Sequence, residues 1–215
     1  MKKYLLIIVL MVGLSEVRAD TRPKSPNHDF ITLYAIQQQR TPTLNRHWLA
    51  VSNSLALSPA PALGHCVYGL AANDKAALYN AAELGGSWLL TAGVTMTLKW
   101  IVNRPRPYTS YPSDLVCLQP LVDPSFPSGH TSLCFATATT LSLFYPRWYV
   151  VVPAFAWAIG VGYSRLYVGA HYPTDVVVGA MVGIGSAVVA HWVRNNIGSH
   201  HPDIVPVMLP VTLTF

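Results

Sequence analysis

Two histidines are placed where they could perform nucleophilic or acid–base chemistry beside a bound anion. His130 directly follows residues 127–129, Pro-Ser-Gly, and His171 lies four residues before Asp175. Serine is a favoured N-cap, and the backbone N–H groups at a helix start bind anions. Residues four apart share one face of a helix, so Asp175 would hold one imidazole nitrogen of His171. The other nitrogen would then be free to attack or to accept a proton.

Four cations accompany these histidines near the ends of apolar segments: Lys99, Arg104, Arg106 and Arg165. A single cation at the end of an apolar helix can simply reach for water. In the same way, a serine before a helix can be a plain cap, and a lone His–Asp pair is more often structural. The combination of all three features, with few carboxylates and no cysteine nearby to bind a metal, favours a catalytic anion site.

Five apolar segments must position these groups, and each is expected to be a helix. They are residues 48–73, 76–98, 131–146, 148–164 and 176–193. Antiparallel helices are joined by short connections. The polar clusters follow the second segment, precede the third, follow the fourth and precede the fifth. All of them would therefore lie at one end of a bundle.

The composition favours a bundle that lies in a membrane. Apolar residues make up 52% of the 215 residues and charged residues only 11%, against about 25% charged residues in soluble domains. This composition argues against disorder and a coiled coil, and a net charge of +5 with several cations already assigned argues against nucleic acid as a partner. Each segment is near the minimum of about 17 residues that crosses a bilayer, and Gly179 and Gly183 suit close helix packing in lipid.

The predicted fold class is all-α, a membrane-embedded helical bundle with about five transmembrane helices after a signal peptide. Residues 1–19 resemble a signal peptide, because Lys2 and Lys3 precede an apolar run and Val17-Arg18-Ala19 offers a cleavage site. We expect an N-terminal arm at 20–47 with a short helix around 30–38, a helical domain at 48–196 and a tail at 197–215. An uncleaved short anchor and a soluble helical core are the alternatives.

The polar clusters together resemble a known family. Lys99, Arg106 and Pro107 fit the pattern KxxxxxxRP, residues 127–130 read PSGH, and residues 164–175 fit SRxxxxxHxxxD. These three linked motifs resemble the signature of the type 2 phosphatidic acid phosphatase superfamily, which also includes bacterial acid phosphatases and vanadium haloperoxidases. The resemblance spans Lys99 to Asp175, and three motifs in the correct order make it specific.

The resemblance implies an all-helical phosphatase that uses neither metal nor cofactor. It implies that His171 attacks phosphorus to form a phosphohistidine, that Asp175 orients His171, and that His130 protonates the leaving oxygen and then activates water. It further implies that the phosphate oxygens are held by Lys99, Arg106, Ser128, the Gly129 amide and Arg165. Arg104 is not a defining position of the signature, so its role stays open.

The expected substrate is a lipid phosphate of the bacterial envelope, with a lipid A phosphate favoured by analogy alone. Undecaprenyl diphosphate and, for a soluble periplasmic acid phosphatase, small phosphate esters are the alternatives; a haloperoxidase is disfavoured by the short chain. The expected location is the inner membrane with the site facing the periplasm. Lys75, Arg147 and Arg194 would then face the cytoplasm. Residues 108–126 are long enough for a lid or specificity loop.

Overall fold

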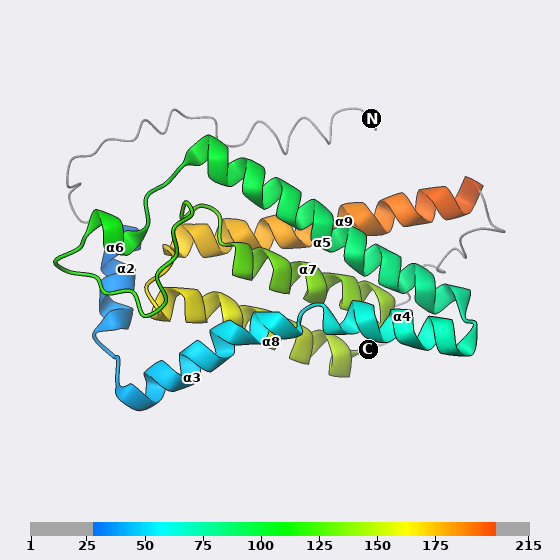
Figure 1. Cartoon of the computed structure of the whole chain (residues 1–215), viewed down its shortest axis with the longest axis horizontal. Coiled ribbons are helices and arrows are strands. Elements are labelled where there is room, and N and C mark those ends of the chain that lie inside the picture. The colour runs from blue at the N-terminus through cyan, green and yellow to red at the C-terminus, as the bar shows by residue number, and fades with distance from the viewer. Residues whose placement is uncertain (1–27, 201–215) are drawn as a thin grey trace.

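The computed structural model describes residues 28–200 and, for side chains, residues 28–196; all regular structure within this part is helical (Figure 1). The all-α prediction is confirmed. The predicted signal peptide and all but the first four residues of the predicted tail lie outside the described residues. The helices are α2 (His28–Gln37), α3 (Pro42–Asn53), the 3₁₀ helix η1 (Ser54–Leu57), α4 (Ala60–Ala72), α5 (Lys75–Val102), α6 (Pro107–Ser110), α7 (Gly129–Phe144), α8 (Trp148–Tyr167) and α9 (Pro173–His200).

Local sequence explains where the first long helical stretch begins and ends. The Thr41 side chain accepts a hydrogen bond from the Leu44 N–H at 3.2 Å, and Pro42 suits the first helical position, so the stretch starts before the predicted residue 48. It ends where Asn73 adopts the left-handed conformation with φ 51°. Asp74 then caps α5 by accepting a hydrogen bond from the Ala76 N–H at 2.8 Å.

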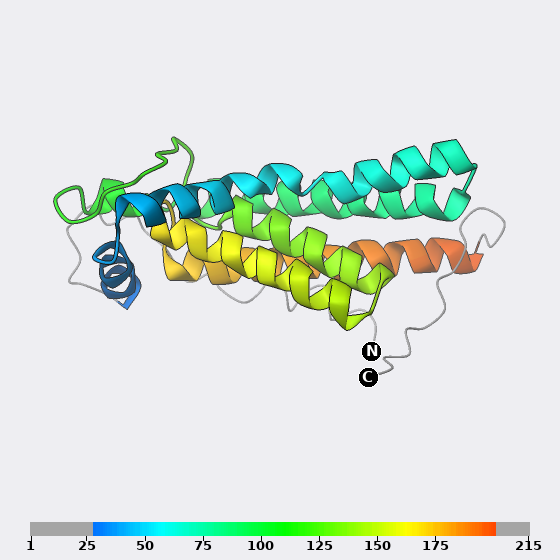
Figure 2. The ribbon, with the colours of Figure 1, turned by 90° about the horizontal axis from the view of Figure 1, so that it is seen from below.

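α7 lies in the middle of the bundle, between α5, α8 and α9 (Figures 1 and 2). α4 pairs with α5, and α3 packs on α8. Two glycines let α9 approach α7 closely, because a Cβ at Gly179 would lie 2.7 Å from the Ser128 carbonyl oxygen and one at Gly183 would lie 2.1 Å from the Ser132 carbonyl oxygen. The predicted packing role of these two glycines is confirmed.

The polarity of the bundle is reversed relative to a water-soluble protein. The outward face of α5 carries large apolar side chains, with Leu89 77% and Trp100 75% exposed. Its inward face is a buried polar stripe formed by Asn80, Glu83, Ser87, Thr91, Thr95 and Lys99. The segment predicted at 76–98 is therefore not uniformly apolar, because its polar residues lie on one buried face. Some hydrogen bonds of this stripe are made across the α5–α7 contact, where the Thr140 hydroxyl donates to the Ser87 hydroxyl at 3.2 Å.

Within the part of the chain that the structure describes, three helical stretches are long and apolar enough to cross a membrane: 42–72, 148–167 and 173–196. α7 is shorter, with 16 residues, and the polar stripe lowers the hydropathy of α5. Neither helix therefore has both the length and the apolar character of these three stretches. All five predicted segments are helices, but five crossings remain a prediction. An apolar exterior around a polar interior is nevertheless what a bilayer selects, because lipid offers buried polar groups no partners.

The fold gathers its irregular chain at one end. α2, α6 and the connection from α6 to α7 lie together there, on the left in Figure 1, beside the C-terminal end of α8 and the start of α9. The α4–α5 turn lies at the other end, as the perpendicular view also shows (Figure 2). Cys66, Cys117 and Cys134 are free thiols.

Candidate active site

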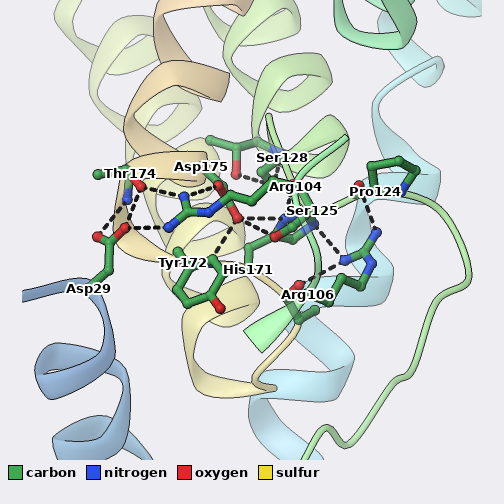
Figure 3. Close-up of polar contacts among 12 residues, drawn as sticks. Asp29, Arg104, Arg106, Pro124, Ser125, Ser128, His171, Tyr172, Thr174 and Asp175 are labelled. Carbon is green, nitrogen blue, oxygen red and sulfur yellow. Dashed lines mark hydrogen bonds and ion pairs between the residues drawn. The ribbon is translucent and has the colours of Figure 1, made fainter. Parts of the chain in front are cut away.

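The helix ends bring the predicted site residues together. Lys99 lies in the last turn of α5, Arg165 in the last turn of α8, and Ser128 caps α7. His171 lies two residues before α9 begins, and Asp175 is in the first turn of that helix. Figure 3 shows His171, Asp175 and Ser128 in one cluster. The convergence predicted from alternating helix directions is therefore what the fold displays.

His171 and Asp175 approach each other in a different way from that predicted. Pro173 starts α9, so His171 lies outside the helix and does not share a helical face with Asp175. The Nδ1 atom of His171 is 2.7 Å from the Ser125 carbonyl oxygen and 3.6 Å from Oδ2 of Asp175. Because a carbonyl only accepts, Nδ1 carries the proton and Nε2 keeps its lone pair. The Ser125 hydroxyl donates to Asp175, so Ser125 links the carboxylate to the imidazole.

The His171 imidazole is neutral at physiological pH. It is 1% exposed, and burial lowers its pKa to about 4, although Asp175 acts in the opposite direction. The positive charges of Arg106 and Arg165 lower the pKa further. Its Nε2 atom lies 3.3 Å from Nη1 of Arg106. The result is an uncharged imidazole whose unprotonated Nε2 accepts a hydrogen bond from the Arg106 guanidinium (Figure 3).

Lys99 and Arg106 meet at a carboxylate that the sequence analysis did not single out. Asp123 lies 3.0 Å from Nζ of Lys99 through Oδ2 and 2.8 Å from Nη2 of Arg106 through Oδ1. Burial raises the pKa of Asp123, but the hydrogen bond and charge of Lys99 and the charge of Arg106 bring it below its ordinary value. Lys99 also donates to the Pro124 carbonyl. The two carboxylate oxygens of Asp123 thus bridge the Lys99 and Arg106 side chains.

Arg165 is the most deeply buried cation of the site, with 0% exposure. Its Nη1 atom donates to the Ser52 hydroxyl and to Oε1 of Gln119, the latter at 2.7 Å. Its Nε and Nη2 atoms have no hydrogen-bond partner among the described residues. Buried N–H groups without partners are costly, so this edge of the guanidinium is suited to the oxygens of a bound anion.

Ser128 and His130 occupy the start of α7 as predicted. The Ser128 side chain accepts from the Thr131 N–H at 3.4 Å, which confirms the N-cap. The Gly129 amide belongs to the first turn, whose N–H groups have no partners within the helix. His130 is half-buried, and burial together with the charge of Arg165, the nearby His171 and the charge of Arg106 lowers its pKa to about 3. The negative charge of a bound phosphate would act in the opposite direction and favour the protonated imidazole. A histidine here can exchange a proton with a group bound near His171.

Several residues of the site could not be identified from the sequence. Ser125 and Asp123 come from the connection between α6 and α7, and Ser52 and Gln119 come from segments without a motif. A serine or an aspartate in a proline-rich loop carries no signal of its own. Asp29 also borders the site from a segment without a motif, through its ion pair with Arg104, one of the four cations expected there.

Sequence comparison finds relatives among curated proteins and one family. Residues 80–199 match the PAP2 superfamily. Three relatives are each 36% identical: the bacitracin transport permease protein BcrC of Bacillus licheniformis over 98 residues, an undecaprenyl-diphosphatase of Sulfolobus acidocaldarius over 86 and a lipid A 1-phosphatase of Rhizobium etli over 90. These matches cover 45%, 40% and 40% of this chain and 46%, 41% and 38% of the relatives. The matched region thus spans less than half the length of each.

Two solved structures share the fold. Aquifex aeolicus LpxE has a TM-score of 0.62 and 29% identity, and the match covers 74% of this chain and 92% of that one. The first transmembrane PAP2 type phosphatidylglycerolphosphate phosphatase from Bacillus subtilis has a TM-score of 0.64, with coverage of 79% and 85%. At 23% identity, this second likeness concerns the fold alone.

Proposed function

The chain belongs to the PAP2 superfamily, and from that premise we propose that it is a membrane phosphatase that hydrolyses a lipid phosphate through a phosphohistidine. One observation carries the proposal. In the buried, neutral His171 the unprotonated Nε2 accepts a hydrogen bond from Nη1 of Arg106 at 3.3 Å, so a nucleophilic nitrogen lies directly beside a phosphate-binding cation. Arg165, with two unpartnered donor atoms, and Lys99 complete a set of fixed positive groups for a phosphoryl transition state.

In the proposed first step, Nε2 of His171 forms a bond to phosphorus as the bond from phosphorus to the lipid oxygen breaks. His130 donates a proton to that leaving oxygen. In the second step, His130 takes a proton from water, and the water oxygen attacks phosphorus. The P–N bond then breaks, and phosphate leaves with His171 neutral again. Lys99, Arg106 and Arg165, with Ser128 and the Gly129 amide, hold the equatorial oxygens.

The shape and surface of the molecule support a lipid as substrate. The site lies where the apolar helices end, so in a bilayer it would lie near the level of the head groups. A lipid phosphate can reach this level without leaving the membrane. Two of the relatives carry names that specify lipid phosphatases, a lipid A 1-phosphatase and an undecaprenyl-diphosphatase.

We favour a lipid A phosphate as the substrate and undecaprenyl diphosphate as the alternative, and each rests on one of these relatives. We place the protein in the inner membrane with the site toward the periplasm. Support comes from the exposed cations Lys75 and Arg147 at the opposite end of the bundle, which suit the cytoplasmic side. The cations at the site end have a catalytic explanation instead.

Phosphate release by the purified full-length protein tests the activity. We expect release from lipid phosphates that resists EDTA and is blocked by vanadate, which imitates five-coordinate phosphorus. His171→Ala should abolish both turnover and acid-labile phosphate trapped on the protein. His130→Ala should lower turnover by about 10²–10⁴-fold through lost proton transfer. The matched control is His65→Ala, because His65 contacts Pro61 and Tyr145 away from the site. Acid-labile phosphate on another residue would refute the nucleophile.

A deletion strain identifies the lipid. If lipid A is the substrate, mass spectrometry of lipid A from the deletion strain shows one added phosphate, and sensitivity to cationic peptides rises with the surface charge. Complementation with the wild-type gene, but not with the His171→Ala gene, restores the original lipid. Unchanged lipid A with accumulated undecaprenyl diphosphate would assign the enzyme to the carrier lipid instead.

A further inference from the structure

The buried carboxylate of Asp175 has more partners than the imidazole that it serves. Its Oδ2 atom accepts hydrogen bonds from the Ser125 hydroxyl and from the Tyr172 N–H, the latter at 2.9 Å. Its Oδ1 atom accepts from Nη1 of Arg104 at 2.7 Å. Oδ1 is thus held by a cation, while Oδ2 is held by the residues that reach His171. Figure 3 shows the guanidinium of Arg104 on the Asp29 side of the Asp175 carboxylate, with Ser125 on the other side.

The Arg104 guanidinium is held by several contacts besides the one with Asp175. Its Nη1 atom also donates to the Thr174 hydroxyl at 2.7 Å, and its Nη2 atom donates to Asp29 at 2.9 Å. The guanidinium lies 3.8 Å from the ring centroid of Tyr172, a cation–π distance. Burial lowers the pKa of Arg104, but the charges of Asp175 and Asp29 raise it above its ordinary value. One guanidinium is therefore shared by two carboxylates.

Asp29 brings the N-terminal arm into this network. It is the second residue of α2, outside the residues that match the family. Besides Arg104, it accepts hydrogen bonds from the Thr174 hydroxyl at 2.5 Å and from the Thr174 N–H at 3.3 Å, at the start of α9. Neighbouring contacts hold α2 independently of Asp29, because Leu33 is fully buried and the Phe30 and Tyr111 rings lie 4.4 Å apart.

We propose that Arg104 is a positioning residue for phosphoryl transfer and that Asp29 fixes it from the N-terminal arm. The inference rests on the proposed function. The chain of contacts runs from Asp29 through Arg104, Asp175 and Ser125 to His171. Arg104 holds Asp175 ionised and in place, Asp175 orients the Ser125 hydroxyl, and the carbonyl of the same residue fixes the Nδ1–H tautomer of His171. The arm thus completes the active site.

This role predicts a loss in turnover and not in substrate binding. The phosphate is held by other cations, so Arg104→Ala should leave KM nearly unchanged. Loss of the groups that orient metal-bound histidines typically costs about 10–100-fold in activity, and by analogy we expect kcat to fall by about that factor. Asp29→Asn removes one charge without removing α2 and should produce a smaller fall in kcat. The control is Asp114→Asn, which changes an exposed carboxylate of the same charge that accepts a hydrogen bond from the neighbouring Ser113 hydroxyl.

Two readouts separate positioning from a merely structural role. Guanidinium chloride at millimolar concentration should restore part of kcat to Arg104→Ala and none to His171→Ala. Arg104→Lys should retain more turnover than Arg104→Ala, because it keeps the charge but not the fork of donors. Wild-type turnover in Arg104→Ala, or a raised KM with unchanged kcat, would refute the inference while leaving the phosphatase proposal intact. A wild-type protein without phosphatase activity would refute the proposed function itself.

Should Arg104→Ala fail to fold, the Asp29→Asn variant decides the matter. Its carbon skeleton is unchanged, and Leu33 and Phe30 still anchor α2. A fall in kcat with unchanged thermal stability supports positioning. A fall in stability with unchanged kcat in the folded fraction would show that Asp29 only fastens the arm.

Discussion

A histidine nucleophile must keep its lone pair at the pH where it works, and the surroundings of His171 accomplish this by burial and nearby charge. The imidazole lies beside two arginines, and Asp175 is reached mainly through Ser125. The carbonyl of Ser125 fixes the tautomer without adding a full negative charge at hydrogen-bond distance. The site therefore combines a low pKa with a defined orientation of Nε2.

The low pKa of His171 has a direct consequence for pH dependence. Protonation removes the nucleophile, so activity is present above the pKa in the folded protein and lost as the pH falls through it. Because that pKa is about 4, the acid limb of kcat/KM should lie near pH 4, well below the ordinary value of about 6.5. Rates measured between pH 3 and 8, with the fold checked by circular dichroism, test this. An acid limb between pH 6 and 7 would contradict it.

Asp123 competes with substrate for the same cations. Its partly exposed carboxylate bridges Lys99 and Arg106, and a phosphate must displace it or share them. Partly exposed pairs contribute about 1 kcal/mol or less, which corresponds to about fivefold in affinity. Asp123→Asn should therefore lower KM, and the inhibition constant for inorganic phosphate, by up to about fivefold. A higher KM would show instead that Asp123 aligns the two cations for binding.

At the scale of the elements, the site depends on how closely α9 approaches α7. Ser128 at the cap of α7 donates its N–H to the Asp175 carbonyl at 3.0 Å, so the two helix starts are bonded directly. The glycines of α9 permit this approach. At a different interface, farther from the site, α5 and α9 are joined by Glu83, which contacts Arg194 at 2.8 Å and His191 at 2.9 Å. Buried charges are thus paired across the bundle.

The glycine at 183 provides a test of this packing. A Cβ there would lie 2.1 Å from the Ser132 carbonyl oxygen, which is backbone and cannot rotate away. Gly183→Ala should therefore force α9 outward, at a cost of about 1–3 kcal/mol, and lower both thermal stability and turnover. Gly185→Ala, two residues along the same helix, is the matched control.

A Cβ at Gly185 meets nothing within 4 Å. That variant should keep wild-type activity and gain up to about 1 kcal/mol from the better helix propensity of alanine. Thermal unfolding in detergent and phosphate release, measured for both variants, give the comparison. Equal behaviour of the two variants would show that α7 and α9 do not need the close contact.

At the scale of the whole molecule, the bundle has one end with the site and another with two tight turns. Arg147 lies in the turn before α8 and Lys75 follows the turn before α5. The proposed orientation places these turns in the cytoplasm and the loop that contains Ser113 in the periplasm. Apolar side chains cover the helices between the two ends, as Leu89 and Trp100 illustrate.

Cysteine labelling tests this topology. In a background that lacks Cys66, Cys117 and Cys134, a membrane-impermeant maleimide applied to cells with a permeabilised outer membrane should label Ser113→Cys. It should leave Arg147→Cys unlabelled until the inner membrane is also opened. Arg147→Cys labelled with the inner membrane intact would reverse the orientation, and quantitative recovery in the soluble periplasmic fraction would remove the protein from the membrane.

The sequence alone was enough to predict the helices, the end of the bundle where they bring the polar groups, and the groups that could act there. These features are local or periodic: Ser128 caps a helix because of its own side chain, and Pro173 begins one because of its ring. The spacing of Lys99 and Arg106 is likewise a property of the chain, as is the order of the three motifs. Such patterns can be recognised in the sequence without knowing which residues are in contact in the folded protein.

The partners of those groups could not be predicted in this way, because they depend on the tertiary structure. The polar stripe of α5 became an interior face because α7 and α9 cover it, and hydropathy alone does not show which face is covered. Asp29, Asp123 and Ser125 reach the site from an arm and a loop whose sequences contain no motif. A hydrogen bond or an ion pair depends on distances of about 3 Å, and the separation of residues along the chain does not determine such distances.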